Sequence, residues 1–461
     1  MLAGGLDINR RLWVCCMMAE IDNEPVKGGG SHIYAERDLT KRLTFSHVKI
    51  MALSSLGTTL EFYEFVIFIL LSPYLSQVFF PGSTPPWMRE FETLAIFSIG
   101  YFTRPIGGVM LAAIGDSKGR RVVFAVSLLL MALPTLLIGF LPTFEKVGIL
   151  APMLLLLCRL LQGLALGGEL PTAMVFMSEH VPERRLGFAF GIVGIGAVLG
   201  FMVADFVLGN VHHFVDKSDF VVYGWRIPFI IGGIFGLIAS LLRRYVGETP
   251  IFQDMKKRHA FSSGNHLARL LRGYKKEVFF AFLLSIVPGV MVTGVQIFPV
   301  IWLQTTKGYH ADLVHGSLRD LQICLIIGAI IGGLIVDVIN WARAIIITLV
   351  LLIISIFAFY LYVTPDTLWI FFSLIGLFLS SLIMMYNPLV HSFPAQLRLT
   401  GISFVYNVGA AIFGGTTPMV LQFIGHYSVI GLAIYPCIFG VIGIIATVFL
   451  WKYRKPLAEI M

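Results

Sequence analysis

The chain has 461 residues, of which 57% are hydrophobic and only 13% charged, and its net charge is +8. A soluble domain carries roughly 25% charged residues, so the excess apolar surface has to face lipid instead of water. The basic residues are spread over loops and not gathered on one surface, which argues against a nucleic-acid-binding protein.

Apolar runs long enough to cross a membrane recur along the whole chain. A helix needs about 20 apolar residues to span the hydrocarbon core. Twelve runs reach that length, at 47–73, 90–114, 122–142, 148–177, 187–209, 224–243, 278–304, 317–338, 344–363, 367–391, 401–424 and 429–451. The sequence therefore predicts an all-α integral membrane protein with twelve transmembrane helices.

Two carboxylates interrupt the first run, in "LGTTLEFYEFVIFIL" at 56–70. The three-residue spacing of Glu61 and Glu64 predicts a shared helical face, roughly 20–25 Å from the membrane edge. An ionised carboxylate at that depth costs about 2.5–3.5 kcal/mol. Burial and mutual repulsion favour keeping a proton on the pair near neutral pH, so we expect proton coupling here. The alternative is a structural pair that is bound to an arginine and never titrates.

Two arginines fall within apolar runs, Arg104 in the second and Arg159 in the fourth, in "RLLQG". A buried guanidinium without a partner is very unfavourable. The expected partners are Glu61, Glu64 or the carboxylate of a solute, which arginine can bind through two hydrogen bonds. A purely structural role is the alternative for each arginine. The substrate-binding residues predicted in the first half are Tyr63, Arg104, Arg159 and Gln162.

The loop "GDSKGRR", Gly115 to Arg121, joins the second and third runs. A short loop between helices needs glycine to turn tightly. Asp116 and Arg120 can pair with each other or with neighbouring helix ends, and so hold two halves together in one conformation. The alternative is a topology signal with a tight turn. The predicted gating residues are Asp116, Gly119, Arg120, Arg121, Glu179 and Arg184.

Carboxylates nearly vanish from the apolar runs of the second half. Breaks such as Pro288-Gly289 and Asn387-Pro388 can free backbone groups to line a cavity. The alternative for each polar residue there is a satisfied position in a helix-packing interface. The substrate-binding residues predicted in the second half are Gln296, Asn387, Tyr406 and Asn407.

A polar, basic segment at 244–277 divides the twelve runs six and six. The stretch "GGVMLAAIGDSKGRR" before this segment has an eroded counterpart, "GGLIVDVINWAR", after it. Such duplication is typical of secondary transporters. The predicted organisation is a tail at 1–45, a six-helix bundle at 46–243, a linker at 244–277, a pseudo-symmetric six-helix bundle at 278–452 and a tail at 453–461.

The distribution of lysine and arginine predicts which side of the membrane each segment occupies. Placing the N-terminus inside puts most basic residues on the inner side, including those of the long middle segment. This excess matches the positive-inside rule. Both termini and the linker are therefore predicted to be cytoplasmic, with a short linker helix on the membrane surface.

Several motifs occur in a fixed order: "LEFYEFVIF", "RPIGGVMLAAIGDSKGRR", "CRLLQGLALGGELPTAMVFMSEHVPERRLGFAFG", "WRIPFIIGG" and "ETPIF". From about residue 46 to 255 this set resembles the metabolite:proton symporter family of the major facilitator superfamily, which includes proline/betaine transporters and carriers of 2-oxoglutarate, citrate and shikimate. The resemblance continues more weakly to the end. It implies proton-coupled uptake across a bacterial inner membrane. The family usually has aspartate as the second acid of the first helix, so the Glu64 side chain is one methylene longer than the family's usual residue.

These observations predict a secondary active transporter that takes up a small carboxylate-bearing solute, either a zwitterionic osmolyte or amino acid or an organic acid, with protons by alternating access. The alternatives are a proton-driven exporter of the same fold and a membrane sensor that does not transport. The sequence shows no nucleophile triad or metal constellation, so we expect no enzyme activity, cofactor or metal. The expected partners are the solute, protons and lipid, and the expected state is a monomer.

Overall fold

The computed structural model describes residues 43–257 and 266–452 of the chain. Within these ranges, twelve helices are long and apolar enough to cross a membrane. The predicted all-α architecture with twelve spans is therefore confirmed.

The first six spans form one bundle, which we call the N-half. Its spanning helices are α2 (Phe45–Phe79), α3 (Pro86–Lys118), α4 (Arg120–Phe140), α6 (Leu150–His180), α7 (Leu186–Phe214) and α9 (Arg226–Arg243). Short elements flank them: α5 (Phe144–Val147), η1 (Glu183–Arg185), α8 (Lys217–Asp219) and η2 (Phe220–Gly224).

The last six spans form the C-half, and three of them are broken into shorter pieces. The unbroken spans are α14 (Ala311–Val338), α15 (Trp341–Tyr362) and α21 (Val429–Lys452). The broken ones are α12 (Lys275–Met291) with η3 (Val292–Ile297) and α13 (Phe298–Thr305); α16 (Leu368–Leu379) with α17 (Ser381–Met384) and α18 (Tyr386–His391); and α19 (Arg398–Gly409) with η4 (Ala410–Gly414) and α20 (Gly415–Tyr427).

The predicted helix ends agree with the structure to within six residues, and the first span shows one of the two largest differences. That prediction ended at residue 73, whereas α2 continues past Pro73 to Phe79. The side chains of Ser76 and Gln77 donate hydrogen bonds to the Pro73 carbonyl oxygen, at 2.8 and 3.0 Å. Pro73 itself removes the N–H that would bond to the carbonyl oxygen of Ile69, and membrane helices tolerate such a loss.

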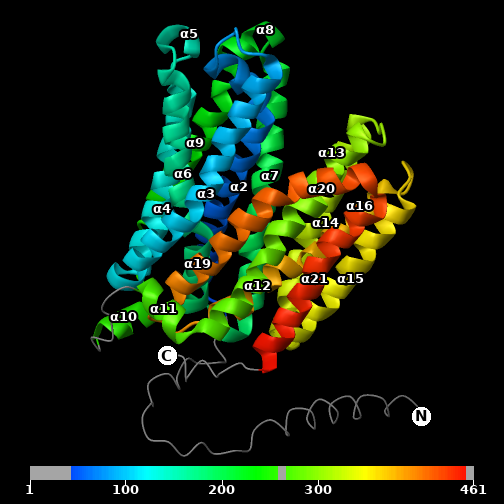
Figure 1. The fold of residues 1–461 in the computed structure, drawn as a ribbon. Coiled ribbons are helices and arrows are strands. Elements are labelled where there is room, and N and C mark those ends of the chain that lie inside the picture. The colour runs from blue at the N-terminus through cyan, green and yellow to red at the C-terminus, as the bar shows by residue number, and fades with distance from the viewer. Residues whose placement is uncertain (1–42, 258–265, 453–461) are drawn as a thin grey trace, which may run out of the picture. The chain divides into compact units, whose positions relative to one another are not determined.

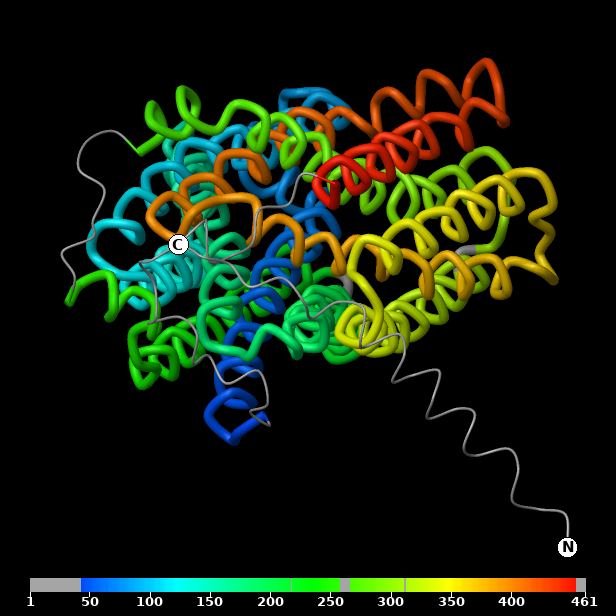
Figure 2. Tube along the Cα trace, turned by 90° about the horizontal axis from the view of Figure 1, so that it is seen from below, coloured from blue at the N-terminus to red at the C-terminus, as the bar shows by residue number. Residues whose placement is uncertain are grey.

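The two halves meet at one end of the molecule, next to the linker helices α10 (Pro250–Lys257) and α11 (His266–Gly273) (Figure 1). We call this the linker end, and the opposite end, where α5, α8 and α13 lie, the far end. Contacts between the halves join α3 and α6 to α19, and α7 to α14 and α17. At the far end α8 and α13 stand well apart (Figure 1), and the view along the helices shows the halves side by side (Figure 2).

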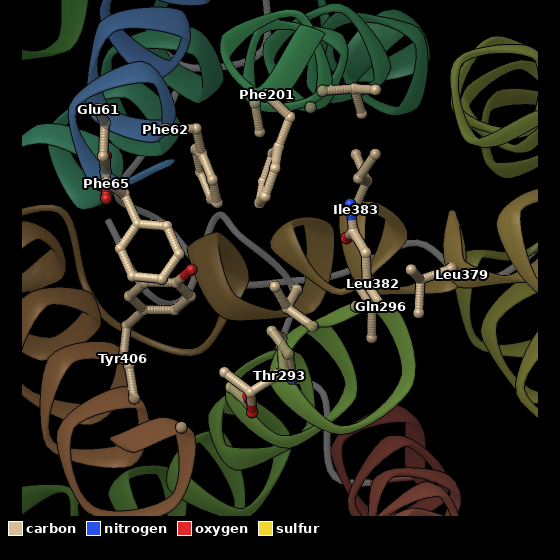
Figure 3. A pocket seen from close by; sticks show the side chains of 18 of the residues that line it. Glu61, Phe62, Phe65, Phe201, Thr293, Gln296, Leu379, Leu382, Ile383 and Tyr406 are labelled. Atoms are coloured by element: carbon tan, nitrogen blue, oxygen red, sulfur yellow. The ribbon is translucent and has the colours of Figure 1, made fainter. Parts of the chain in front are cut away.

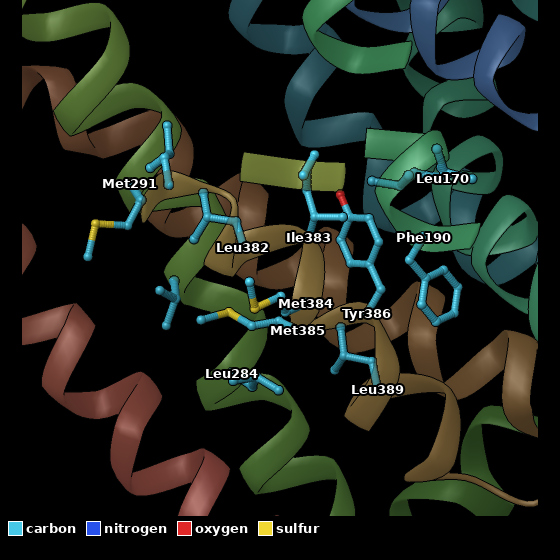
Figure 4. Close-up of a cluster of buried hydrophobic side chains, with 14 of the residues drawn as sticks. Leu170, Phe190, Leu284, Met291, Leu382, Ile383, Met384, Met385, Tyr386 and Leu389 are labelled. Carbon is cyan, nitrogen blue, oxygen red and sulfur yellow. The ribbon is translucent and has the colours of Figure 1, made fainter. Parts of the chain in front are cut away.

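An apolar cluster continues from one half into the other and holds them together above the linker end (Figure 4). Phe190 of α7 lies edge-on to Tyr386 of α18, with ring centroids 6.0 Å apart. Leu170 from α6 and Leu382 and Met385 from the C-half belong to the same cluster. A second cluster lies wholly within the N-half.

The linker contains two short helices, where a single surface helix was predicted. Ile251 and Met255 of α10 form a small apolar cluster with Ala395, which precedes α19. Leu270 of α11 is fully buried. The linker helices therefore pack against the base of the C-half instead of only lying on a surface.

Glycines set how closely α3 and α6 approach. A Cβ atom placed on Gly107 of α3 would collide with the backbone of Leu164, and one on Gly167 of α6 would collide with the Arg104 carbonyl group. Small residues allow membrane helices to pack with their backbones in contact. This close contact fixes the height of Arg104 within the bundle.

We expect the substitution Gly107→Val to lower the thermal unfolding temperature of the detergent-solubilised protein, because overpacking costs about 1–3 kcal/mol. Gly209→Val is the matched control, since a Cβ at Gly209 meets no other atom within 4 Å. Equal unfolding temperatures for the two variants would contradict the close packing of α3 and α6.

Candidate functional site

A cavity lies between the halves, lined by α2, α3, α6 and α7 on one side and by α14 and the broken spans of the C-half on the other (Figure 3). It encloses about 1070 Å³ of space between atoms, including the part that opens to solvent. Its walls are mostly apolar and aromatic. The aromatic residues are Phe62, Phe65, Tyr101, Phe201, Tyr386 and Tyr406.

One ion pair sits in this apolar wall. The Nη2 atom of Arg104 donates to Oε1 of Glu61 at 2.7 Å, and both side chains are more than nine-tenths buried. Among the described residues that line the cavity, these two alone carry full charges. Oε2 of Glu61 and Nε of Arg104 have no hydrogen-bond partner among the described residues. The pair therefore keeps donor and acceptor capacity at the cavity wall.

Glu64 does not point into the cavity as Glu61 does, although it follows Glu61 by only three residues. It does not line the cavity and is 2% exposed within the N-half. The Thr135 hydroxyl donates to Oε1 of Glu64, and the Gln162 amide donates to Oε2 at 3.2 Å. Three residues advance a helix by about 300°, so the two side chains point about 60° apart. This turn directs Glu64 toward α4 and α6 and leaves Glu61 at the cavity wall.

Arg159 also lies outside the cavity lining. Its guanidinium centre is 3.5 Å from the ring centroid of Phe68, and its Nε and Nη2 atoms have no hydrogen-bond partner among the described residues. Cation–π stacking on Phe68 and attraction to Glu64 offset part of the free-energy cost of burying the Arg159 charge. Its predicted contact with a solute stays a prediction.

The other predicted substrate residues divide between the cavity and helix interfaces. Gln296 and Tyr406 line the cavity. The Tyr63 hydroxyl donates to the Pro228 carbonyl oxygen at 2.7 Å, and the Asn407 amide donates to the Gly167 carbonyl oxygen at 2.7 Å. Tyr63, Gln162, Asn387 and Asn407 all lie outside the lining. For Asn387 and Asn407, the packing alternative agrees with their position.

Three of the predicted gating residues, Asp116, Arg120 and Glu179, lie in a buried polar layer at the linker end. The sequence did not point to the other two members of this layer, Arg398 and Thr400. We call these five residues the latch layer. Arg120 lies 3.3 Å from Asp116 and 3.4 Å from Glu179. Across the boundary between the halves, Arg398 lies 3.3 Å from Glu179. The backbone N–H and hydroxyl groups of Thr400 donate to Asp116 at 3.0 and 2.8 Å. The layer thus ties α3, α4 and α6 to α19.

The remaining predicted gating residues lie around this layer. Gly119 has φ = 123°, a conformation that favours glycine. The backbone N–H groups of Arg120 and Arg121 donate to Glu248 of the linker, each at 3.1 Å. Arg184 is exposed in η1. The linker therefore bonds to the first turn of α4.

The repeat in the sequence corresponds to a repeat in these contacts. Asp337, at the end of α14, accepts hydrogen bonds from the N–H groups of Gly187 and Phe188 at 2.7 and 3.1 Å. Asp116, at the end of α3, does the same for the start of α19. Each aspartate binds the first turn of a helix in the other half, where orphan N–H groups and the helix dipole favour an anion.

Sequence reasoning missed one buried pair that joins four helices of the N-half. Arg243, the last residue of α9, donates to both carboxylate oxygens of Glu169 at 2.5 and 2.9 Å. It also bonds to the carbonyl oxygens of Leu53 and Phe124, and Ser127 donates to Glu169 at 2.6 Å. Its position at a span end looked like a topology signal, and a lone carboxylate in the fourth run was the available clue to a partner.

The arrangement supports binding and proton exchange. The cavity presents a paired carboxylate and guanidinium to a small solute, and the latch layer closes the linker end beneath it. No group of three metal-binding side chains is found in the described part of the chain.

Comparisons with known proteins point to membrane transporters. The model of the Major Facilitator Superfamily matches residues 53–418. A putative proline/betaine transporter of Staphylococcus aureus (strain COL) is 30% identical over 376 residues, which cover 81% of each chain. The proline/betaine transporter of Salmonella typhimurium is 29% identical over 419 residues, covering 86% of this chain and 82% of that protein.

Solved structures share the fold. The proton:xylose symporter XylE is 19% identical, with a TM-score of 0.73, over 90% of this chain and 98% of that one. The transporter FucP, in the outward conformation, is 16% identical, with a TM-score of 0.66, over 88% and 99% of the two chains.

We expect Glu169→Gln to destabilise the protein strongly, because loss of one partner leaves the Arg243 charge buried and uncompensated, at about 3–5 kcal/mol. The double variant Glu169→Gln/Arg243→Met should recover most of the loss in thermal unfolding temperature. A double variant no more stable than the single one would show that the pair is not the source of the stability.

Proposed function

The chain belongs to the major facilitator superfamily, and from this premise we propose that it is a proton-coupled symporter that takes up a small carboxylate-bearing solute by alternating access. Members of the superfamily are transporters and not enzymes. The twelve apolar helices and the bacterial relatives support a multi-pass protein of the bacterial inner membrane.

We place the linker end in the cytoplasm. The linker and the loop at 118–121 are rich in lysine and arginine, and the positive-inside rule puts such segments on the cytoplasmic side. The cavity would then be closed toward the cytoplasm by the latch layer and would open outward. This orientation suits a carrier waiting for solute from outside.

The contact between Glu61 and Arg104 carries the proposal. An ionised Glu61 occupies the guanidinium at 2.7 Å and competes with any carboxylate in the cavity. A proton on Glu61 removes its charge and weakens the pair, because hydrogen bonds between ions are roughly twice as strong as neutral ones. Arg104 is then available to a carboxylate of the solute. Proton and solute therefore bind together, which is the requirement for symport.

Glu64 and Arg159 would support this exchange from within the N-half. Their charges attract each other and lie close to the Glu61 site. A change of charge on Glu61 therefore changes the electrostatic potential at Glu64. We propose Glu61 as the site of the coupled proton and Glu64 as the residue that adjusts the local charge.

The composition of the cavity favours a solute with one carboxylate. Arg104 is the one guanidinium among the described residues of the lining, so a second or third carboxylate would lack a partner. The surrounding rings can attract an alkylated ammonium group through cation–π contacts, worth about 0.5–2 kcal/mol each. Zwitterions such as the substrates for which the relatives are named, proline and betaine, fit this combination better than citrate does.

The proton gradient can supply the work. One positive charge that crosses a membrane potential of about 100 mV releases about 2.3 kcal/mol, enough for roughly 40-fold accumulation. The latch layer would then separate. Glu61 would release its proton and Arg104 the solute on the other side of the membrane.

Uptake into right-side-out membrane vesicles tests the proposal, with proline, glycine betaine, 2-oxoglutarate and citrate as the panel and external pH recorded. We expect uptake of the zwitterions, with alkalinisation outside. Uptake without alkalinisation, or efflux driven by an inward proton gradient, would contradict symport.

We expect Glu61→Gln to abolish accumulation against a gradient while exchange of internal for external solute persists, because a neutral amide frees Arg104 permanently but cannot release a proton. Glu90→Gln is the control, because it makes the same change at an exposed glutamate outside the cavity lining. Full accumulation by the Glu61 variant would remove the proposed coupling role.

We expect Arg104→Lys to raise the apparent KM for the carboxylate solute about tenfold or more, because an ammonium group cannot reproduce a two-bond contact with a carboxylate. The exposed Arg343 gives the control, Arg343→Lys. An unchanged KM in initial-rate measurements would exclude Arg104 as a ligand of the solute.

A further inference from the structure

Opposite charges face each other across the far-end opening between the halves. Asp205 lies on α7, and His315 and Arg319 lie on α14, all with exposed side chains. Asp205 lies close enough to be attracted by Arg319 and by His315 whenever His315 is protonated. Among the ion pairs that the described residues form in this conformation, none includes Asp205.

Glycine contacts near the linker end fix how α7 and α14 face each other. A Cβ on Gly187 would collide with the Gly333 carbonyl group, and a Cβ on Gly191 with that of Ala329. The second contact lies four residues later than the first on α7 and four residues earlier on α14. The two helices are therefore antiparallel, and their facing sides are known.

Asp205 and the α14 charges fall on these same facing sides. Asp205 follows Gly187 by 18 residues, and His315 precedes Gly333 by 18 residues. Eighteen residues make five turns at 3.6 residues per turn, so both side chains return to the face of their glycine. Arg319 lies one turn closer to the linker end than His315 does, about 40° from that face.

The three side chains also lie near residues that line the cavity. Phe201, one turn before Asp205, lines the cavity, as does Leu325, six residues after Arg319. The three side chains therefore lie on the far-end side of residues of α7 and α14 that line the cavity.

We propose that Asp205 pairs with Arg319, with His315 beside it, when the far end closes, so that these residues form a second gate opposite the latch layer. A rocking motion about the Gly187–Gly333 contact brings the outer parts of α7 and α14 together as the linker end opens. Closure removes the charges from water, and a buried charge without a partner is strongly unfavourable. Complementary charges make closure possible, and single or like charges oppose it.

This inference rests on the alternating-access part of the proposed function, and not on the proton site or the solute. A crosslinking experiment therefore tests it without transport. Asp205→Cys and His315→Cys are introduced together in the full chain whose own cysteines are replaced, and disulfide formation is measured in membranes. A disulfide forms only when the two Cα atoms come within about 7 Å.

We expect little crosslinking in this background and about fivefold more when Asp116→Asn weakens the latch layer. The control pair is Val203→Cys with Ile323→Cys, which are exposed and lie about 160° and 80° around their helices from Gly187 and Gly333. Absence of the crosslink in both backgrounds, or equal crosslinking of the control pair, overturns the proposal.

Charge reversal provides the second test, with solute uptake as the readout. Asp205→Arg and Arg319→Asp should each lower the rate at least about tenfold, because like charges would meet on closure. The double reversal should restore most of the rate, and Asp320→Arg, which faces away from α7, should leave it unchanged. A double reversal no faster than the single variants overturns the pairing. Failure of the solute panel would leave the crosslinking result intact, so the two proposals fail separately.

Discussion

A charge inside the bundle has to be neutralised by a partner, and this constraint organises the molecule. Water is scarce there, so an unpaired carboxylate or guanidinium is strongly unfavourable. Glu169 and Arg243 meet the requirement permanently, with two direct hydrogen bonds and further bonds to backbone carbonyl groups. Glu61 and Arg104 meet it at a cavity wall, where an incoming group can replace one partner. The same rule therefore yields a structural pair in one place and an exchangeable pair in the other.

The halves use this rule differently. Within the cavity, the N-half supplies both charges, whereas the C-half supplies apolar, hydroxyl and amide groups from spans that are broken at η3 and η4. The latch layer connects the halves through the contact of Arg398 with Glu179 and the hydrogen bonds of Thr400 to Asp116, which join the halves while the linker end is closed. Opening that end exposes these groups to water and makes the loss of their partners tolerable. Hydration of these groups in the open conformation can thus offset the contacts that they lose. The two conformations can then be close in free energy and interconvert.

The sequence predicts the spans well and the directions of side chains poorly. Hydropathy is a local property, so the range 429–451 comes within one residue of α21 at either end. Whether Glu61 or Glu64 faces the cavity depends on how α2 is rotated against its neighbours, and Gly196 and Gly200 of α7 set this rotation by their close contact with α2. The pairing of Arg398 with Glu179 links residues more than two hundred positions apart. A hint existed in the chain, because "RLG" at 185–187 and "RLT" at 398–400 occupy equivalent places in the two halves.

The central claim is that solute and proton share the Glu61–Arg104 pair. The most direct measurement is proton uptake by the purified protein when its transported solute binds, recorded with a pH indicator in weakly buffered detergent solution near neutral pH. Linkage between the two ligands predicts uptake of up to about one proton for each solute bound, and none in a protein whose Glu61 has been replaced by glutamine. Binding of the solute without proton uptake in the unaltered protein would contradict the account.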